Sequence, residues 1–137
     1  MGRPGFHAWQ ISLIVLDTSV LIDSLSGSKR SAAALRKIIE AGERLSLPSL
    51  VLYEWLRGPR SREELVAQEA LLPSESALPF GPLEAALTAK LYQSVRHPRG
   101  RELDLAIAAH AIALEAGLWT LNVADFRDIP ALRLETG

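Results

Sequence analysis

The sequence predicts an α/β protein in three layers, with helices on both faces of a central, mostly parallel sheet of four to five strands. Two observations lead to this prediction. Short apolar runs typical of strands alternate with longer stretches of helical periodicity, and the 137 residues, 48% of them hydrophobic, suffice for a single core. We therefore expect one domain over residues 1–137, with residues 1–12 as an N-terminal extension.

The first predicted strand is the apolar run 13–16, which ends at Asp17. Thr18 and Ser19 come next and suit the start of a helix. A carboxylate at the carboxyl end of a buried strand lies where open α/β sheets hold their ligands. The alternative is that the side chain of Asp17 only caps the following helix.

The next elements repeat this strand-and-helix pattern. Residues 28–41 have the apolar spacing of an amphipathic helix that ends before Gly42. Residues 44–47 alternate polar and apolar side chains as a short strand does. Pro48 then ends that strand, and a helix follows over residues 49–56.

Proline residues and a helix-capping motif mark the boundaries of the predicted elements in the middle of the chain. Ser61 and Glu64 have the spacing of a capping box, which opens a helix that runs to about Leu72. Residues 77–80 suit a short third strand at a sheet edge, because the proline inside it cannot donate to a ladder. A helix is predicted over residues 83–95.

The C-terminal third begins with the most apolar helix of the chain, predicted over residues 103–116 and ended by Gly117. Residues 118–121 suit a strand, and residues 132–134 suit a final edge strand. The expected order of elements is therefore β-α-α-β-α-α-β-α-α-β-β.

Composition limits the chemistry that the protein performs. The chain has no cysteine, which excludes disulfides, thiolate nucleophiles and cysteine-bound zinc. Its net charge is −1, so nucleic acid binding must depend on a local basic patch. No apolar run has the length of a signal peptide core or a membrane span. We expect a cytoplasmic protein that does not associate with membranes.

Three acidic residues lie in apolar surroundings, at Asp17, Glu54 and Asp104. Taken singly, Asp104 suits the dipole at a helix start, and Glu54 suits a solvated face or an ion pair with Arg57. Buried carboxylates are costly unless they are paired or bind metal, and like charges that converge need a cation to offset their repulsion. Oxygen ligands of this kind suit Mg²⁺ or Mn²⁺.

Four blocks of the sequence, in this order and spacing, resemble the signature blocks of PIN-domain ribonucleases. The compact size and the Glu-x-x-Arg-Gly pattern resemble, within that superfamily, the VapC toxins of prokaryotic type II toxin–antitoxin modules. The resemblance spans roughly residues 13–134; the longer segment 1–12 and Trp119 depart from the family pattern. The four blocks are residues 14–22, 49–58, 104–111 and 118–126.

The resemblance implies Mg²⁺-dependent hydrolysis of RNA phosphodiester bonds, with Mn²⁺ as a second candidate metal. It maps Asp17, Glu54 and Asp104 onto the acids that hold the metal. The fourth acidic position falls on either Asn122 or Asp125, and the sequence leaves this choice open. Hydroxyl groups that orient the carboxylates or a metal-bound water correspond to Ser19 and Thr120.

The resemblance also implies a homodimer and a small VapB-like antitoxin whose C-terminal tail crosses the active-site groove. The basic turn around Arg99 and Arg101 is a candidate for contact with the RNA backbone, or else a solvated loop. Large apolar residues at 50–56 exceed what one short helix needs for its own core, so part of them is expected to face a partner. Two other functions remain open: a PIN-domain nuclease of RNA processing without an antitoxin, and a binding module that has lost catalysis.

Overall fold

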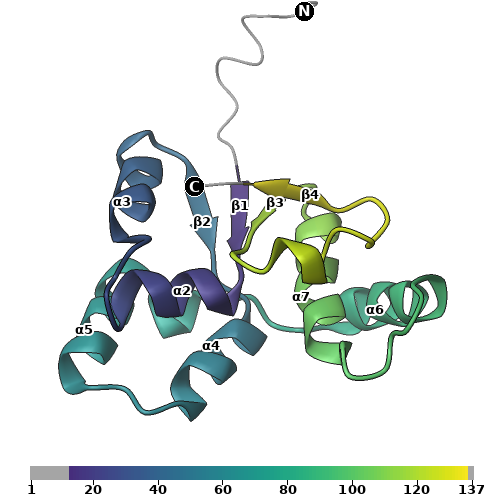
Figure 1. The fold of residues 1–137 in the computed structure, drawn as a ribbon, viewed down its shortest axis with the longest axis horizontal. Coiled ribbons are helices and arrows are strands. Elements are labelled where there is room, and N and C mark those ends of the chain that lie inside the picture. Colours follow the sequence, from purple (N-terminus) through teal and green to yellow (C-terminus); the bar gives the residue numbers. More distant parts are fainter. Residues whose placement is uncertain (1–12, 136–137) are drawn as a thin grey trace, which may run out of the picture.

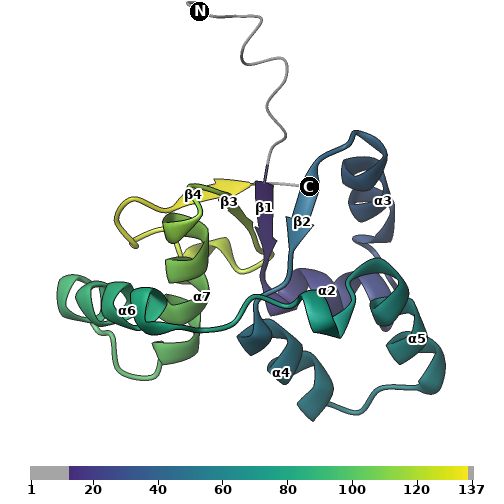
Figure 2. The same ribbon diagram turned by 180° about the vertical axis from the view of Figure 1, so that it is seen from behind.

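The computed structural model describes residues 13–135, so the predicted extension 1–12 lies outside the described residues. Its sheet has four strands in the order β2-β1-β3-β4, and every neighbouring pair is parallel. Figures 1 and 2 show this sheet at the centre of the molecule. The strands are β1 (Leu13–Leu16), β2 (Arg44–Ser46), β3 (Gly117–Trp119) and β4 (Arg133–Glu135).

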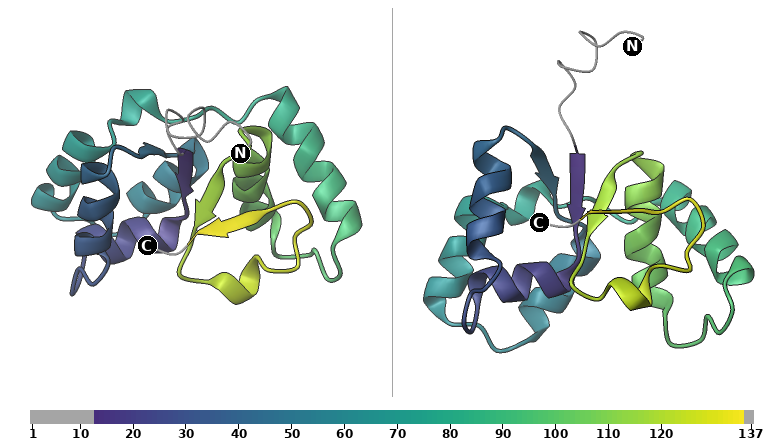
Figure 3. Two further views of the ribbon diagram at one scale, coloured as in Figure 1. Left: turned by 90° about the horizontal axis from the view of Figure 1, so that it is seen from above. Right: turned by 45° about the horizontal axis from the view of Figure 1, so that its top comes forward.

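Within residues 13–135, six α-helices surround the sheet. The connection from β1 to β2 moves one way along the sheet, and the connection from β2 to β3 moves back across β1. Because such crossovers are right-handed, the two moves place helices on opposite faces; Figure 3 shows α2 and α3 on one side and α7 on the other. The helices are α2 (Thr18–Leu25), α3 (Ala32–Glu40), α4 (Ser49–Arg57), α5 (Arg62–Leu71), α6 (Pro82–Ser94) and α7 (Glu102–Ala113).

The core lies where β1 and β3 meet α7. Residues 105–111 of α7 are all buried, which confirms that this apolar helix lies in the interior. Val15 and Leu118, on neighbouring strands in register, are fully inaccessible to solvent. Since β1 and β3 are both central strands, their carboxyl ends are held rigidly beside each other.

The predicted strand at residues 77–80 is wrong. Leu78 forms only an isolated parallel bridge with Pro48, through a hydrogen bond from the Ser49 amide to the Leu78 carbonyl at 2.8 Å and one from the Leu78 amide to the Leu47 carbonyl at 2.8 Å. The partner segment enters α4 at Ser49, so its next backbone groups belong to the helix and the ladder cannot continue. The sheet therefore has four strands.

Two helix ends also differ from the prediction. The helix expected to end at Gly117 stops at Ala113, and Glu115 takes the left-handed conformation with φ of 53°. Gly117 instead opens β3, where a Cβ atom would lie 2.3 Å from the side chain of Glu135. The helix expected from residue 28 begins at residue 32, because Lys29 takes the left-handed conformation with φ of 54°, which a right-handed helix cannot include.

Other predicted features are present. The capping box is complete, since the Glu64 amide donates to Ser61 Oγ at 3.1 Å and the Ser61 amide donates to Glu64 Oε1 at 2.8 Å. Pro82 is the first residue of α6, and residues 133–135 form the edge strand β4. Among the described residues, no helix combines the length and the apolar character needed to cross a bilayer.

Replacement of Leu118 by alanine should destabilise the fold by about 2–4 kcal/mol, because it leaves a cavity between the sheet and α7. The control is Leu121→Ala, two residues after β3, where the side chain is 49% exposed and the expected loss is below about 0.5 kcal/mol. Urea unfolding followed by circular dichroism measures both. Equal losses would contradict the placement of Leu118 in the core.

Candidate active site

Asp17 lies directly after β1 and is 4% exposed. Although it occupies the N-cap position of α2, its side chain makes no capping hydrogen bond. Its Oδ2 atom instead accepts hydrogen bonds from the Ser19 hydroxyl at 2.8 Å and the Thr120 hydroxyl at 2.7 Å. Within the described residues, Oδ1 receives no hydrogen bond. The capping explanation for Asp17 is therefore excluded, and one of its oxygens is available to a ligand.

The hydroxyls of Ser19 and Thr120 also fix the backbone around Asp17. The Leu121 amide donates to Ser19 Oγ at 3.0 Å, and the Asn122 amide donates to Thr120 Oγ1 at 2.9 Å. These two side chains therefore tie the segments after β1 and β3 to each other. Because β1 and β3 are neighbours where the chain reverses its direction along the sheet, this is the place where open sheets form a ligand crevice.

Glu54 enters the same region from α4. The Thr18 hydroxyl donates to Glu54 Oε1 at 2.5 Å, and Arg57 Nη2 lies 3.5 Å from Oε2. The Arg57 guanidinium also stacks over the Tyr53 ring at 5.2 Å. Both oxygens of Glu54 are thus held by neighbours. The ion pair with Arg57 was one of the alternatives for Glu54, whereas the hydrogen bond from Thr18 was not predicted, because nothing in the sequence indicates which element packs against α2.

Asp104, in the first turn of α7, carries the clearest electrostatic signal. Burial and the negative charges of Asp17, Asp125 and Glu54 raise its pKa from 3.8 to about 6, while Arg101 acts in the opposite direction. The charges of three carboxylates from other parts of the chain therefore reach Asp104. An acid that is strongly perturbed by burial and by specific charged neighbours is typical of a functional site.

The segment after β3 carries the two candidates for the fourth acidic position. The charge of Asp125 acts on Asp104, whereas the side chain of Asn122 is exposed and makes no hydrogen bond with the described residues. Asp125 therefore lies within electrostatic range of Asp104, whereas Asn122, a neutral amide, gives no such signal at any distance.

The basic turn before α7 splits into two different environments. Arg99 is exposed. Arg101 forms an ion pair with Asp128 at 2.6 Å, and its side chain is 21% exposed. The Asp128 hydrogen bond raises the pKa of Arg101, and it lowers the pKa of Asp128. Arg101 is therefore already paired within the protein, which the sequence did not predict.

The donor set fits a hard divalent cation. Its ligands would be carboxylate oxygens, and the surplus negative charge that perturbs Asp104 is what a cation would offset. Among residues 13–135, no three acidic or histidine side chains are close enough to enclose a metal ion by themselves. Mg²⁺ does not need such a cage, because it keeps several waters and takes one or two protein carboxylates.

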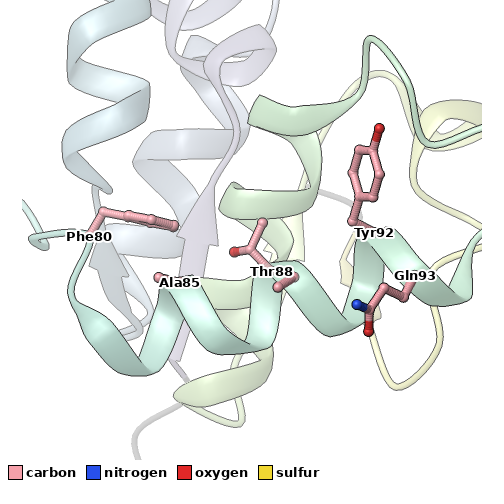
Figure 4. Close-up of a pocket in the computed structure, with 6 residues that line it drawn as sticks. Phe80, Ala85, Thr88, Tyr92 and Gln93 are labelled. Atoms are coloured by element: carbon pink, nitrogen blue, oxygen red, sulfur yellow. The ribbon is translucent and has the colours of Figure 1, made fainter.

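The pocket shown in Figure 4 lies away from these acids. It is a hollow of about 370 Å³ on the surface of α6, and its lining holds no acidic side chain. His110 packs against Phe80 with ring centroids 6.0 Å apart and is 2% exposed. This histidine is therefore a core residue.

Comparison with known proteins identifies the class of protein. The model of the PIN domain family matches residues 14–132, and the chain belongs to this family. More particularly, it is 33% identical over 126 residues to ribonuclease VapC19 of Mycobacterium tuberculosis, covering 87% of this chain and 96% of that protein. The resemblance indicated by the four sequence blocks is thus confirmed.

Solved structures confirm the fold. VapBC2 from Rickettsia felis, bound to a promoter DNA fragment, superposes with a TM-score of 0.70 at 20% identity, covering 91% of this chain and 98% of that one. The DNA-bound VapBC of Salmonella typhimurium gives a TM-score of 0.70 at 20% identity, covering 93% of this chain and 98% of that one. Both comparisons show that the fold is shared.

Replacement of Asp104 by asparagine should stabilise the metal-free protein at pH 7 by about 1–2 kcal/mol, after allowance for solvent screening. The folded-state pKa of about 6 lies above the unfolded value, so ionised Asp104 opposes folding at pH 7. Protonation removes this cost as the pH falls through 6, so the two proteins should converge near pH 4. Chemical unfolding at both pH values in EDTA measures this.

The control for this prediction is Asp128→Asn. Arg101 lowers the pKa of Asp128, so its ionised form favours folding, and the substitution should reduce stability at pH 7. An Asp104→Asn variant that is less stable than wild type at pH 7 would show that the carboxylate is not under electrostatic stress.

Proposed function

We propose that this protein is a divalent-metal-dependent endoribonuclease of the VapC type, the toxin of a toxin–antitoxin pair. The observation that carries the proposal is the group of acids at the carboxyl ends of β1 and β3, where three other acids raise the pKa of Asp104. The named ribonuclease among its relatives, at 33% identity, supports the same activity. PIN-domain nucleases generally depend on a divalent metal, and Mg²⁺ suits this donor set.

One or two of the acids Asp17, Glu54, Asp104 and Asp125 would bind the metal directly, and the others would act on it through its bound waters. Asp17 is fixed through Oδ2 by two hydroxyls, and Glu54 is fixed by Thr18. When bound, Mg²⁺ lowers the pKa of a coordinated water and offsets charge that develops on the scissile phosphate. We assign the fourth acidic position to Asp125, and we assign Asn122 no direct ligand role.

The protein's own residues orient the reaction in three ways. Ser19 and Thr120 hold the Asp17 carboxylate in one orientation. The buried strand ends keep the site rigid, so little reorganisation is needed when substrate arrives. Arg99, on the exposed turn before α7, is available to contact the RNA backbone. We place this activity in the cytoplasm, where RNA substrates occur.

An exposed apolar surface beside the acids suits the antitoxin. On α4, Trp55 is fully buried, whereas Tyr53 and Leu56 are 53% and 51% exposed. These two residues border a shallow hollow that also includes Leu52 and Arg57. Because Arg57 contacts Glu54, a peptide that binds this hollow lies next to the candidate active site.

A second exposed apolar surface supports the expected homodimer. On α6, Leu91 is the one buried residue, and the helix carries few charges. Leu83 is 65% exposed, and Phe80 and Tyr92 are 40% and 38% exposed. Helices that are apolar on most sides are usually covered, and a nearly neutral surface does not repel its own copy.

Asp17→Asn and Asp104→Asn should each reduce Mg²⁺-dependent RNA cleavage by roughly 100-fold or more, since even residues that only support metal ligands cost 10–100-fold. EDTA should abolish cleavage by the wild type. A fluorescent RNA substrate and purified proteins measure both effects, with circular dichroism as a check on folding. Asp23→Asn, in α2 but paired with Arg30, is the control and should cleave normally. Undiminished cleavage by both active-site variants would falsify the nuclease proposal.

Production of the chain alone should arrest bacterial growth, and a small DNA-binding antitoxin encoded beside it should restore growth. Tyr53→Ser and Leu56→Ser should each weaken antitoxin binding roughly tenfold, as loss of an apolar anchor does, and leave RNA cleavage unchanged. Titration calorimetry measures the affinity. Leu83→Ser, on α6, is the control and should bind the antitoxin as the wild type does. Equal weakening by all three variants would place the antitoxin elsewhere.

A further inference from the structure

Arg101 ties the start of α7 to the segment that carries Asp125. Its Nη2 atom donates to Asp128 Oδ1 at 2.6 Å and to the Asp125 carbonyl at 2.9 Å. Its Nη1 atom donates to Asp128 Oδ2 at 3.0 Å and to the Arg96 carbonyl at 3.3 Å. The two bonds to Asp128 form a bidentate ion pair, the geometry that gives an arginine–carboxylate contact its directionality.

These contacts leave Arg101 little capacity to bind RNA. A guanidinium has five N–H donors, and the four on Nη1 and Nη2 correspond to four acceptors of the protein. A bidentate contact with a phosphate would have to break the pair with Asp128. Arg101 therefore differs from its neighbour Arg99, which is exposed in the same turn.

The tethered segment needs an external support. Phe126 and Ile129 anchor it in the core, at 1% and 4% exposure, but Asp125 and Asp128 are both exposed. The charge of Asp125 repels that of Asp104. In the absence of an opposing contact, this repulsion favours movement of the segment away from α7. Arg101 has the opposite effect on Asp104: its positive charge lowers the pKa that Asp125 raises.

We propose that Arg101 and Asp128 are positioning residues of the active site, which hold the segment 122–128 so that Asp125 stays beside Asp104. This inference rests on the proposed function, because it assigns the pair a purpose in that same site. Arg101 is well placed for this, since its own carbonyl accepts the Leu105 amide at 2.9 Å and so belongs to the first turn of α7. The pair thus connects the two acid-bearing segments directly.

The decisive variant is Asp128→Ala. If Arg101 contacts RNA through its charge, removal of a neighbouring acid frees that charge and strengthens RNA binding. If Arg101 is a positioning residue, the same substitution releases the segment. We then expect hydrogen exchange at the amides of residues 125–127 to become at least tenfold faster in metal-free protein, and the dissociation constant for Mg²⁺ to rise roughly tenfold. Asp128→Glu retains the carboxylate and should restore both values to near those of the wild type.

Arg101→Ala should reproduce the effects of Asp128→Ala, with a lower kcat for RNA cleavage. Arg99→Ala is the matched control: it should raise KM for RNA and leave hydrogen exchange and Mg²⁺ affinity unchanged. Exchange mass spectrometry and titration calorimetry provide readouts that do not depend on turnover. Because Asp128 is 46% exposed, its replacement leaves the core intact.

The outcomes separate the two proposals. Unchanged exchange and Mg²⁺ affinity in both Arg101→Ala and Asp128→Ala would overturn the positioning inference, as would tighter RNA binding by Asp128→Ala with normal exchange. If the wild type cleaves no RNA while both variants lose protection and Mg²⁺ affinity, the nuclease proposal fails and the positioning inference stands.

Discussion

The carboxylate of Asp17 is buried at the carboxyl end of β1, and the site is arranged around this constraint. A buried carboxylate is costly unless it has partners, and here Oδ2 has two, Ser19 from the start of α2 and Thr120 from the end of β3. The same hydroxyls accept amide protons from the segment after β3. One charged group thus determines how two strand ends and two loops meet.

Asp104 is under electrostatic stress in the folded protein. Folding brings four acids together, and burial together with their charges makes the ionised form of Asp104 unfavourable at neutral pH. A protein selected for stability alone would replace such a group, and strain of this kind is retained where function needs it. A bound cation would remove this stress, so the cost of the metal-free state and the proposed affinity for metal would have the same origin.

Neutralising contacts within the protein are distributed around this group rather than placed at its centre. Thr18 and Arg57 hold Glu54, and Arg101, which is paired with Asp128 across two segments, acts on Asp104 from the start of α7. Because Arg101 is paired with Asp128, it only partly offsets the negative charge around Asp104, whose pKa stays raised. That arrangement suits a hard cation with several waters better than a closed cage of protein ligands.

The sequence by itself determined the local features, because these depend on residues close in the chain. The buried strand that ends at Asp17, the capping box at Ser61 and the apolar helix α7 were all predictable in this way. The strand expected at residues 77–80 is absent because strand pairing depends on residues distant in the chain. It requires a partner whose amides and carbonyls continue in register.

Only the tertiary structure decided which side chains meet. The bond from Thr18 to Glu54 spans 36 residues, and the pair of Arg101 with Asp128 spans 27. No periodicity records such contacts, because they depend on how helices pack and on how the segment after β3 returns over α7. For the same reason the sequence left the choice between Asn122 and Asp125 open, and our assignment of the fourth position to Asp125 is a proposal supported by its charge acting on Asp104.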